Sequence, residues 1–482
     1  MTYSAVLSQR ARFETWLLVS FLILNATLFL FAEEKVESGV NYSATYWNAS
    51  DGQRYWGVAI NLAAKGEFTV PTANNEPLTR AGPLPALIFS APISLVGFDH
   101  APVIIVGLQC FLLYLMGAFA HHMTPGREGT RRLAQVLVAF NPNLVGLAHH
   151  AQSDLIFSFF LAAMLCLGMN IVRSGNRVKW RWFVLLGFSA GCLTLARPAG
   201  QFYSILFPLF LLFSIIFSDQ RQRVTWRVFW PGAAIYFFCF ILVTTPWAIR
   251  NHNVLDDFGL SQSEAIMMKD QYKFFLRFSG KSEDVRSGML DAAADEYLRE
   301  RDENLTCKYR LKDKDCKSIM TRAYLQAILN APPLEIAKGL GSAWATLYFG
   351  GAASRLSKYL GLEITDLHLI WTGHFKGAES VRDYVSVAAQ KHGKYILVLA
   401  MFLAFVFVTR ILGLVGSIRM FLERRLQPQL TIFVMTLGLF TAMYLFVGIT
   451  RYRAPLEIIL MILAAVGYEK LRTRRPRQRG EG

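Results

Sequence analysis

Long apolar stretches alternate with short basic segments along this chain, a pattern typical of a protein that crosses a membrane many times. A helix needs about 20 mostly apolar residues to cross the hydrocarbon core of a bilayer. Ten stretches approach that length: 14–32, 101–121, 133–149, 155–172, 183–196, 202–217, 228–246, 395–415, 430–449 and 454–468. The pattern therefore predicts an all-α polytopic membrane protein with about ten or more spans.

One further apolar stretch, 83–98, is brief and carries three prolines. It predicts either a span or a re-entrant or interfacial segment. Only the second alternative places the basic segments further along the chain on one side; the sequence leaves both alternatives open. The stretch 14–32 could be a signal peptide, but no convincing small-x-small cleavage site precedes Glu33. We therefore expect it to remain as the first span.

The basic residues orient the predicted spans. With the N-terminus inside, the inner segments are 1–13, 123–132, 173–182, 218–227, 410–429 and 469–482. Together they carry 22 Lys or Arg and 5 Asp or Glu, and the rest of the chain has a net charge of −1. Short basic loops stay on the cytoplasmic side. We expect a multi-pass protein of the plasma (inner) membrane, with both termini in the cytoplasm.

Composition excludes several classes of protein. The chain is 53% hydrophobic and only 17% charged, whereas an ordinary soluble domain has roughly a quarter of its residues charged. A conventional water-soluble enzyme and a disordered chain are both excluded. The net charge of +16 could indicate nucleic-acid binding, but topology accounts for it, so we expect a membrane-lipid partner and no nucleic acid.

Two long segments fall on the outer side. The first is the loop 33–100, and the second is 247–394, of which 251–330 carries 14 of the chain's 34 acidic residues and 13 Lys or Arg. This balanced composition predicts a small, mostly helical extracytoplasmic subdomain, and the apolar, Gly-rich stretch 338–352 predicts an interfacial helix. The expected domains are a transmembrane catalytic module (1–246), an extracytoplasmic subdomain (247–394), and C-terminal spans with a basic tail (395–482).

The six cysteines divide into two groups. Cys110, Cys166, Cys192 and Cys239 lie in predicted spans and are interpreted as small apolar side chains. Cys307 and Cys316 are nine residues apart in the outer subdomain. On the oxidising side of a membrane such a pair predicts a disulfide. Two cysteines alone make a poor zinc site, because structural zinc takes four ligands.

Several arginines lie at the predicted outer ends of spans or in outer loops, against the positive-inside bias. They are Arg54, Arg80, Arg197, Arg250, Arg451 and Arg453. A guanidinium near the hydrocarbon edge is costly unless it is paired or ligated. Several around one outer cavity would suit a phosphate group, which guanidinium binds through bidentate hydrogen bonds. For any single arginine, the alternative is a side chain that reaches from a helix end to the polar interface.

Acidic and imidazole side chains on the outer side are the candidates for chemistry. Asp51 in the first outer loop could act as a general base, or it could cap a helix, a role for which Ser50 competes. Asp154 opens a predicted span on the same side and could also be a cap. His149 and His150 are adjacent, so on a helix they cannot face one metal together. If a divalent cation binds, Asp51, Asp154 and one histidine are the expected ligands; no metal is assigned.

The chain carries an ordered set of short motifs over nearly its whole length. They are Asp51, Tyr55, Ala59 and Gly66; Arg80 with Pro83, Leu84 and Pro85; Arg197–Pro198; Pro246, Trp247, Arg250 and Asn251; and Arg451, Tyr452, Arg453 and Pro455. In this order the set resembles the GT-C superfamily of polyprenyl-phosphate-dependent glycosyltransferases. Its aminoarabinose and galacturonic acid transferases of lipid A, and the protein O-mannosyltransferases, are the most similar.

The resemblance implies a GT-C-like helix bundle and roles for specific residues. Asp51 matches the catalytic acid of the first outer loop, Asp154 the second acidic residue, and Arg80 the basic residue that holds the donor phosphate. Two departures matter: Gly52 stands where many relatives have Glu, and Gly82-Pro83-Leu84 replaces Pro-Pro-Leu. The first weakens any scheme that uses an acid pair or a metal.

The implied reaction transfers a sugar from a polyprenyl-phosphate donor to a glycan, lipid or protein acceptor, through a hydroxyl or a phosphate. Inversion is expected, with Asp51 as the base. The donor phosphate is assigned to Arg80, Arg250, Arg451 and Arg453, with Arg54 and Arg197 as second choices; Tyr55, His149 and His150 are assigned to the substrate site. Two alternatives stay open: a transporter or flippase of lipid-linked sugars, and a non-catalytic binder of them.

Overall fold

A computed structural model describes residues 3–30, 51–70, 76–78, 81–217, 224–261, 264–281, 283–301, 307, 314–350 and 396–474. This part of the chain is helical, and its one β-bridge pairs Thr69 with Pro77. The helices outside the subdomain are α1 (Tyr3–Leu30), α2 (Asp51–Lys65), α3 (Leu84–Val96), α4 (Ala101–Met123), α5 (Glu128–Ala139), α6 (Pro142–Ala148), α7 (Ser153–Ser174), α8 (Trp180–Ala196), α9 (Ala199–Ile216), α10 (Trp226–Leu255), α17 (Ile396–Leu422), α18 (Gln427–Met443) and α19 (Ala454–Arg474). The short 3₁₀ helices η2 (Gly175–Arg177), η7 (Arg424–Leu426) and η8 (Thr450–Arg453) connect some of them. The predicted all-α polytopic fold is confirmed.

Each of the ten predicted apolar stretches overlaps a helix. Among the described residues, seven helices are long and apolar enough to cross a membrane, and α3 and α8 are shorter apolar helices. The count of ten or more spans stays a prediction. With 13 residues and a rise of about 1.5 Å per residue, α3 is too short to cross a bilayer as a straight helix, which favours the re-entrant or interfacial alternative for 83–98.

Two predicted stretches end differently in the structure. The continuous segment expected over 133–149 is wrong, because the chain breaks between α5 and α6: Asn141 caps α6, its Oδ1 accepting from the backbone N–H groups of Asn143 and Leu144 at 3.0 and 3.3 Å, and Pro142 follows as the first helical residue. The segment expected over 430–449 stops being helical at Met443, because the next residues turn to meet the subdomain.

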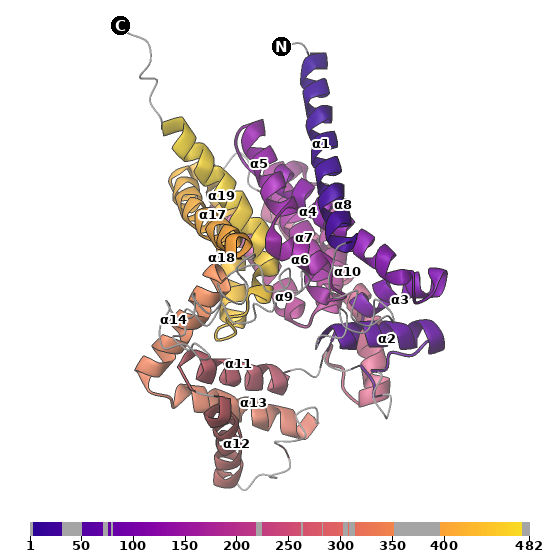
Figure 1. Cartoon of the computed structure of the whole chain (residues 1–482), viewed down its shortest axis with the longest axis vertical. Helices are drawn as coiled ribbons and strands as arrows, with labels where there is room; N and C mark the ends of the chain where they lie inside the picture. Colours follow the sequence, from indigo (N-terminus) through magenta and orange to yellow (C-terminus); the bar gives the residue numbers. More distant parts are fainter. Residues whose placement is uncertain are drawn as a thin grey trace.

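The two ends of the bundle differ in what they carry. Both chain termini lie at one end, and α2 and the helices α11 to α13 lie at the other (Figure 1). The predicted basic segments 123–132 and 173–182 connect helices at the end that carries the termini (Figure 1). The arrangement therefore separates a basic end from an end that carries the soluble helices.

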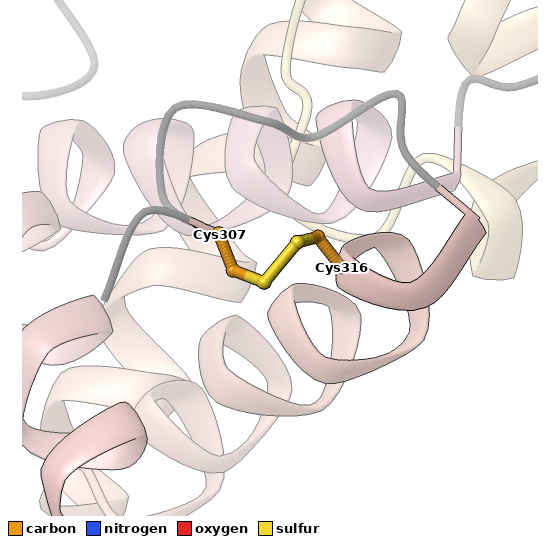
Figure 2. The surroundings of a disulfide bond; sticks show 2 residues. All are labelled: Cys307 and Cys316. Atoms are coloured by element: carbon orange, nitrogen blue, oxygen red, sulfur yellow. A yellow bond between two sulfur atoms is a disulfide. The ribbon is translucent and has the colours of Figure 1, made fainter. Parts of the chain in front are cut away.

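The four helices of the subdomain are α11 (Glu264–Phe278), α12 (Glu283–Glu300), α13 (Lys314–Leu329) and α14 (Pro333–Phe349). Helix α14 overlaps the stretch 338–352, whose interfacial position stays a prediction. They share a small core of their own, which includes Tyr272, Leu298 and Met320. A disulfide joins Cys307 to Cys316 at the start of α13, with Cα atoms 5.0 Å apart (Figure 2). The core and the disulfide together stabilise the subdomain itself.

Gln271 of α11 attaches the subdomain to the bundle. Its Nε2 donates to the carbonyl oxygen of Met443 at 2.7 Å, and its Oε1 accepts from the backbone N–H of Phe446 at 2.9 Å. Phe446 also packs edge-on against Phe275, with ring centroids 5.2 Å apart. These contacts satisfy backbone groups left open where α18 ends, and they fix α11 against the end of the bundle.

Close packing in the bundle requires glycine at one crossing. Helices α17 and α19 approach so closely that a β-carbon at Gly467 would overlap the carbonyl oxygen of Leu412, and one at Gly416 would overlap that of Leu463. This approach brings a buried ion cluster together. Glu457 of α19 accepts hydrogen bonds from Arg410 at 3.1 Å and from Arg453 at 2.5 Å.

The same carboxylate also accepts from Asn141 at the α5–α6 break, at 3.1 Å. Arg453 is fully buried and donates to the carbonyl oxygens of Leu347, Tyr348 and Gly350 at the end of α14, at 2.8 to 3.1 Å. The Glu457 cluster therefore joins α14, α17 and α19 to the α5–α6 break.

Glu457→Gln should lower the stability of the folded protein by about 3–5 kcal/mol, because two buried guanidiniums would lose their carboxylate. The measurement is the midpoint temperature at which detergent-solubilised protein loses its monomer peak in size-exclusion chromatography. Glu423→Gln is the matched control, because Glu423 also pairs with arginines but is 29% exposed. Equal midpoints for the two variants would contradict the structural role of Glu457.

Candidate active site

A cavity of about 230 Å³ lies at the end of the bundle opposite the chain termini. Five parts of the chain surround it: the start of α2, the residues just before α3, the α8–α9 connection, the first half of α11, and the segment from the end of α18 to η8. Its lining residues are Arg54, Tyr55, Ala81, Arg197, Pro198, Ala199, Ile266, Met267, Asp270, Gln271, Tyr444, Val447 and Tyr452. The cavity thus lies where the membrane helices meet the subdomain.

Two arginines beside the cavity share one buried carboxylate. Asp154 in the first turn of α7 is 2% exposed, and its Oδ1 accepts a hydrogen bond from Nη1 of Arg197. Nε of Arg451 lies 3.6 Å from the same oxygen. The carboxylate compensates the two guanidiniums where they leave water, and it holds them side by side.

Aromatic rings complete this group. The guanidinium carbons of Arg197 and Arg451 each lie 5.2 Å from the ring centroid of Tyr452, a distance at which a cation is attracted to a ring. Tyr444 stacks on Tyr452 with centroids 4.5 Å apart. We call Asp154, Arg197, Arg451 and Tyr452 the arginine clamp.

Arg197 of the clamp keeps its charge. Burial by itself would lower the pKa of Arg197, but the Asp154 carboxylate together with the neighbouring tyrosines holds that pKa well above its usual range. Burial raises the pKa of Tyr444 to about 12, although Arg197 acts in the opposite direction. At neutral pH the guanidinium therefore stays charged, and the phenol stays a hydrogen-bond donor.

The Arg-Pro sequence explains why Arg197 reaches the cavity. A residue before proline avoids the helical region, and Arg197 accordingly adopts extended backbone, with φ −151° and ψ 140°, directly after α8 ends. Helix α9 then begins behind Pro198. Gly82 packs against this turn, where a β-carbon would overlap the carbonyl oxygen of Leu195. The turn is therefore fixed, and it presents Arg197 to the cavity.

Helix α2 supplies two lining residues, Arg54 and Tyr55. Asp51 begins this helix and lies three and four positions earlier, so it shares their face. The side chain of Asp51 lies outside the described part of the structure, as do both the backbone and the side chain of Arg80. Their predicted roles stay predictions.

Arg250 holds the segment that leads toward Arg80. Its Nη1 donates to the carbonyl oxygen of Leu78 at 3.0 Å, and its Nη2 donates to that of Phe68 at 3.2 Å. Its guanidinium also lies over the ring of Trp247, 4.6 Å from the centroid. In the described contacts Arg250 therefore positions a loop and is absent from the cavity lining.

Three other predicted residues also lie away from the cavity. Arg453 belongs to the Glu457 cluster described above. His149 is fully buried, with Nε2 3.0 Å from Oδ1 of Asn25, and His150 is 4% exposed, with Nδ1 2.7 Å from the carbonyl oxygen of Gly146. These histidines pack between helices, so the structure does not bring them into the substrate site.

The cavity also contains residues that the sequence did not single out. They are Asp270 and Gln271 of α11, and Tyr444 after α18. Asp270 places a carboxylate on the wall, more than 200 positions after Asp51 in the sequence. The described residues contain no group of three His, Cys, Asp or Glu side chains able to hold a metal ion.

No family model and no curated protein matches this chain. Among solved structures, it is similar to the oligosaccharyltransferase AglB of Archaeoglobus fulgidus in complex with an inhibitory peptide and a dolichol-phosphate. The TM-score is 0.49 at 12% identity, covering 97% of this chain and 53% of that one. A second structure of the A. fulgidus oligosaccharyltransferase, tethered to an acceptor peptide, has a TM-score of 0.48 at 13% identity, covering 95% and 50% of the two chains.

ArnT of Cupriavidus metallidurans bound to undecaprenyl phosphate has a TM-score of 0.38 at 12% identity, covering 94% of this chain and 78% of that one. The chain spans about half the length of the archaeal chains it matches. The function below is argued from this chain's own residues.

Arg250→Lys should loosen the loop held by Arg250, because a single ammonium cannot replace a guanidinium fork that bridges two carbonyl groups. The backbone N–H of Val70 donates to the carbonyl oxygen of Glu76 at 2.8 Å, and that of Leu78 donates to the carbonyl oxygen of Phe68 at 2.9 Å. We expect both amides to exchange hydrogen about fivefold faster, which corresponds to the loss of about 1 kcal/mol of hydrogen bonding. Hydrogen–deuterium exchange mass spectrometry measures this. Arg227→Lys, at the exposed start of α10, is the control, and unchanged exchange in Arg250→Lys would contradict the assignment.

Proposed function

We propose that this chain is a membrane glycosyltransferase that moves a sugar from a polyprenyl-phosphate donor to an acceptor hydroxyl on the extracytoplasmic side of the membrane. The arginine clamp is the observation that supports this most directly. Its two guanidiniums and one carboxylate leave one net positive charge beside a cavity at the end of the apolar bundle. A phosphodiester with an isoprenoid tail carries one negative charge and would lie at this level of a bilayer.

Charge development explains how such a clamp would assist transfer. The acceptor oxygen attacks the anomeric carbon, and the bond from that carbon to the phosphate oxygen breaks, both electrons leaving with the lipid phosphate. The phosphate gains negative charge as it departs, and guanidiniums fixed before the reaction stabilise that charge without reorganising. One displacement of this kind inverts the anomeric centre and needs no nucleotide.

Asp51 would accept the proton of the acceptor hydroxyl. It begins α2 on the face that also carries Arg54 and Tyr55, both of which line the cavity. Asp154 is the weaker candidate for this step, because it is buried and its Oδ1 is already engaged by the clamp. We therefore assign Asp154 to positioning of the two arginines, and we regard Asp270 on α11 as a second carboxylate near the acceptor.

Arg197→Gln should weaken binding of undecaprenyl phosphate by about tenfold or more, because one charge-assisted contact to phosphate is lost. Native mass spectrometry of the full protein, titrated with that lipid, measures the bound fraction. Arg181→Gln is the matched control: Arg181 is exposed in the first turn of α8, at the opposite end of the helix that Arg197 follows. Equal binding by both variants would overturn the phosphate site.

Asp51→Asn should lower sugar transfer by about 10²–10⁴-fold while the lipid still binds, because only the proton acceptor is removed. The measurement compares lipids and glycans, by mass spectrometry, in cells that carry the wild type, Asp51→Asn, Asp270→Asn or no copy of the protein. The expected order of product is wild type, then Asp270→Asn, then Asp51→Asn. Full product from Asp51→Asn would remove Asp51 from the chemistry, and lipid-linked sugar that only changes sides would favour a flippase.

A further inference from the structure

A second cavity, of about 400 Å³, lies within the subdomain, between α11, α12, α13 and the start of α14. Its volume falls in the range of small-molecule sites. Its lining includes Glu296, Glu300, Glu335, Lys281, Gln326 and Asn330 as polar side chains. No step of the transfer reaction described above uses this cavity.

The polar lining is acidic. Three carboxylates face one ammonium group, and that ammonium is already paired, because Nζ of Lys281 lies 3.1 Å from Oε1 of Glu335. Arg301 adds a second cation at the edge of the lining, because its Nη1 lies 3.4 Å from Oε2 of Glu300. Counted with Arg301, the lining carries a net charge of −1, the opposite sign to the arginine clamp. Phosphorylated or carboxylated ligands would be repelled here, since like charges discriminate strongly against a partner.

The remaining lining favours hydroxyl groups. Gln326 and Asn330 add amide groups that both donate and accept hydrogen bonds, and Tyr272, Phe275 and Tyr297 add ring surface. Burial, together with Glu296 and Glu335, raises the pKa of Tyr272, so its phenol remains a hydrogen-bond donor. Carboxylates, amides and rings around one cavity suit a ligand that presents hydroxyl or amine groups and apolar C–H faces.

We propose that this cavity binds a saccharide unit of the acceptor, neutral or carrying an amine, and so selects which acceptor reaches the transfer site. This inference rests on the proposed glycosyltransferase function. A cationic peptide would use the carboxylates but would leave the amides and rings with little to bind, so a saccharide is the better match.

Helix α11 connects the two cavities. Met267, Asp270 and Gln271 line the cavity beside the arginine clamp, which we call the basic cavity. Tyr272, Phe275 and Leu276 line the cavity within the subdomain, which we call the acidic cavity. The two cavities are therefore separated by about one helix diameter, about 10 Å. Gln271, which attaches α11 to the bundle, fixes this separation. An acceptor held by one saccharide unit in the acidic cavity could thus extend past α11 to present its next unit to the clamp.

The test measures binding of four trisaccharide-sized probes to full-length protein in lipid nanodiscs by isothermal titration calorimetry. The probes are chitosan trimer (amine-bearing), cellotriose (neutral), trigalacturonate (acidic) and tetralysine (a cationic peptide). We expect chitosan trimer and cellotriose to bind, chitosan trimer more tightly, and trigalacturonate to bind at least tenfold more weakly than cellotriose. Glu296→Gln should weaken the binding of chitosan trimer by about tenfold, which corresponds to one lost hydrogen bond to a charged group.

Two further variants make the result decisive. Ala292→Trp fills the cavity from an exposed position on α12 and should abolish saccharide binding without disturbing the core. Asp291→Asn removes an exposed charge from the same helix outside the cavity and should change nothing. Absence of saccharide binding, a preference for tetralysine, or binding that Ala292→Trp leaves intact would each overturn the proposal. Undecaprenyl phosphate binding, measured on the same samples, reports separately on the arginine clamp, so the two proposals fail independently.

Discussion

The carboxylate of Asp154 is the contact on which the candidate site depends. Guanidiniums near the hydrocarbon edge are stable only with a counter-charge, and one buried oxygen serves both Arg197 and Arg451. Because two cations share one anion, a positive charge remains for a ligand. One carboxylate for each arginine would have left no net positive charge. The shared carboxylate therefore stabilises the clamp and also leaves it a positive charge that could attract an anion.

The Glu457 cluster uses the same residue types for a different purpose. There too one carboxylate meets two guanidiniums, but Nη1 of Arg453 donates to three backbone carbonyl groups, its Nε donates to Glu457, and its side chain is fully buried. Arg451 and Arg453 stand two residues apart in the 3₁₀ helix η8, where a turn takes three residues, so their side chains point in directions about 120° apart. One short motif therefore supplies one arginine to the clamp and one to the Glu457 cluster.

Features that each segment determines by itself could be predicted from the sequence. The bilayer acts on every span separately, so apolar stretches predicted the helices and basic loops predicted the end of the bundle that carries the termini. The charge-balanced segment predicted the helical subdomain. The break at Asn141 was missed because its capping contacts and Glu457 lie far apart in the sequence. His149 and Arg453 were placed in the site because the sequence shows how near a residue lies to the end of a span, but not which way its side chain points. Asp270 was missed because α11 reaches the bundle only through tertiary contacts such as Gln271.

Helix α11 shows how the fold organises two opposite charges in one protein. The basic cavity belongs to the membrane helices, and the acidic cavity belongs to the subdomain, yet both use the side chains of this helix. A phosphate ligand and a hydroxyl- or amine-bearing ligand need surroundings of opposite sign, and a single open cavity would let each weaken the binding of the other. A helix held by a buried glutamine between the two cavities keeps their fields apart while keeping their ligands within reach. Under the proposed function, the subdomain is therefore part of the active site and is more than a cover for the bundle.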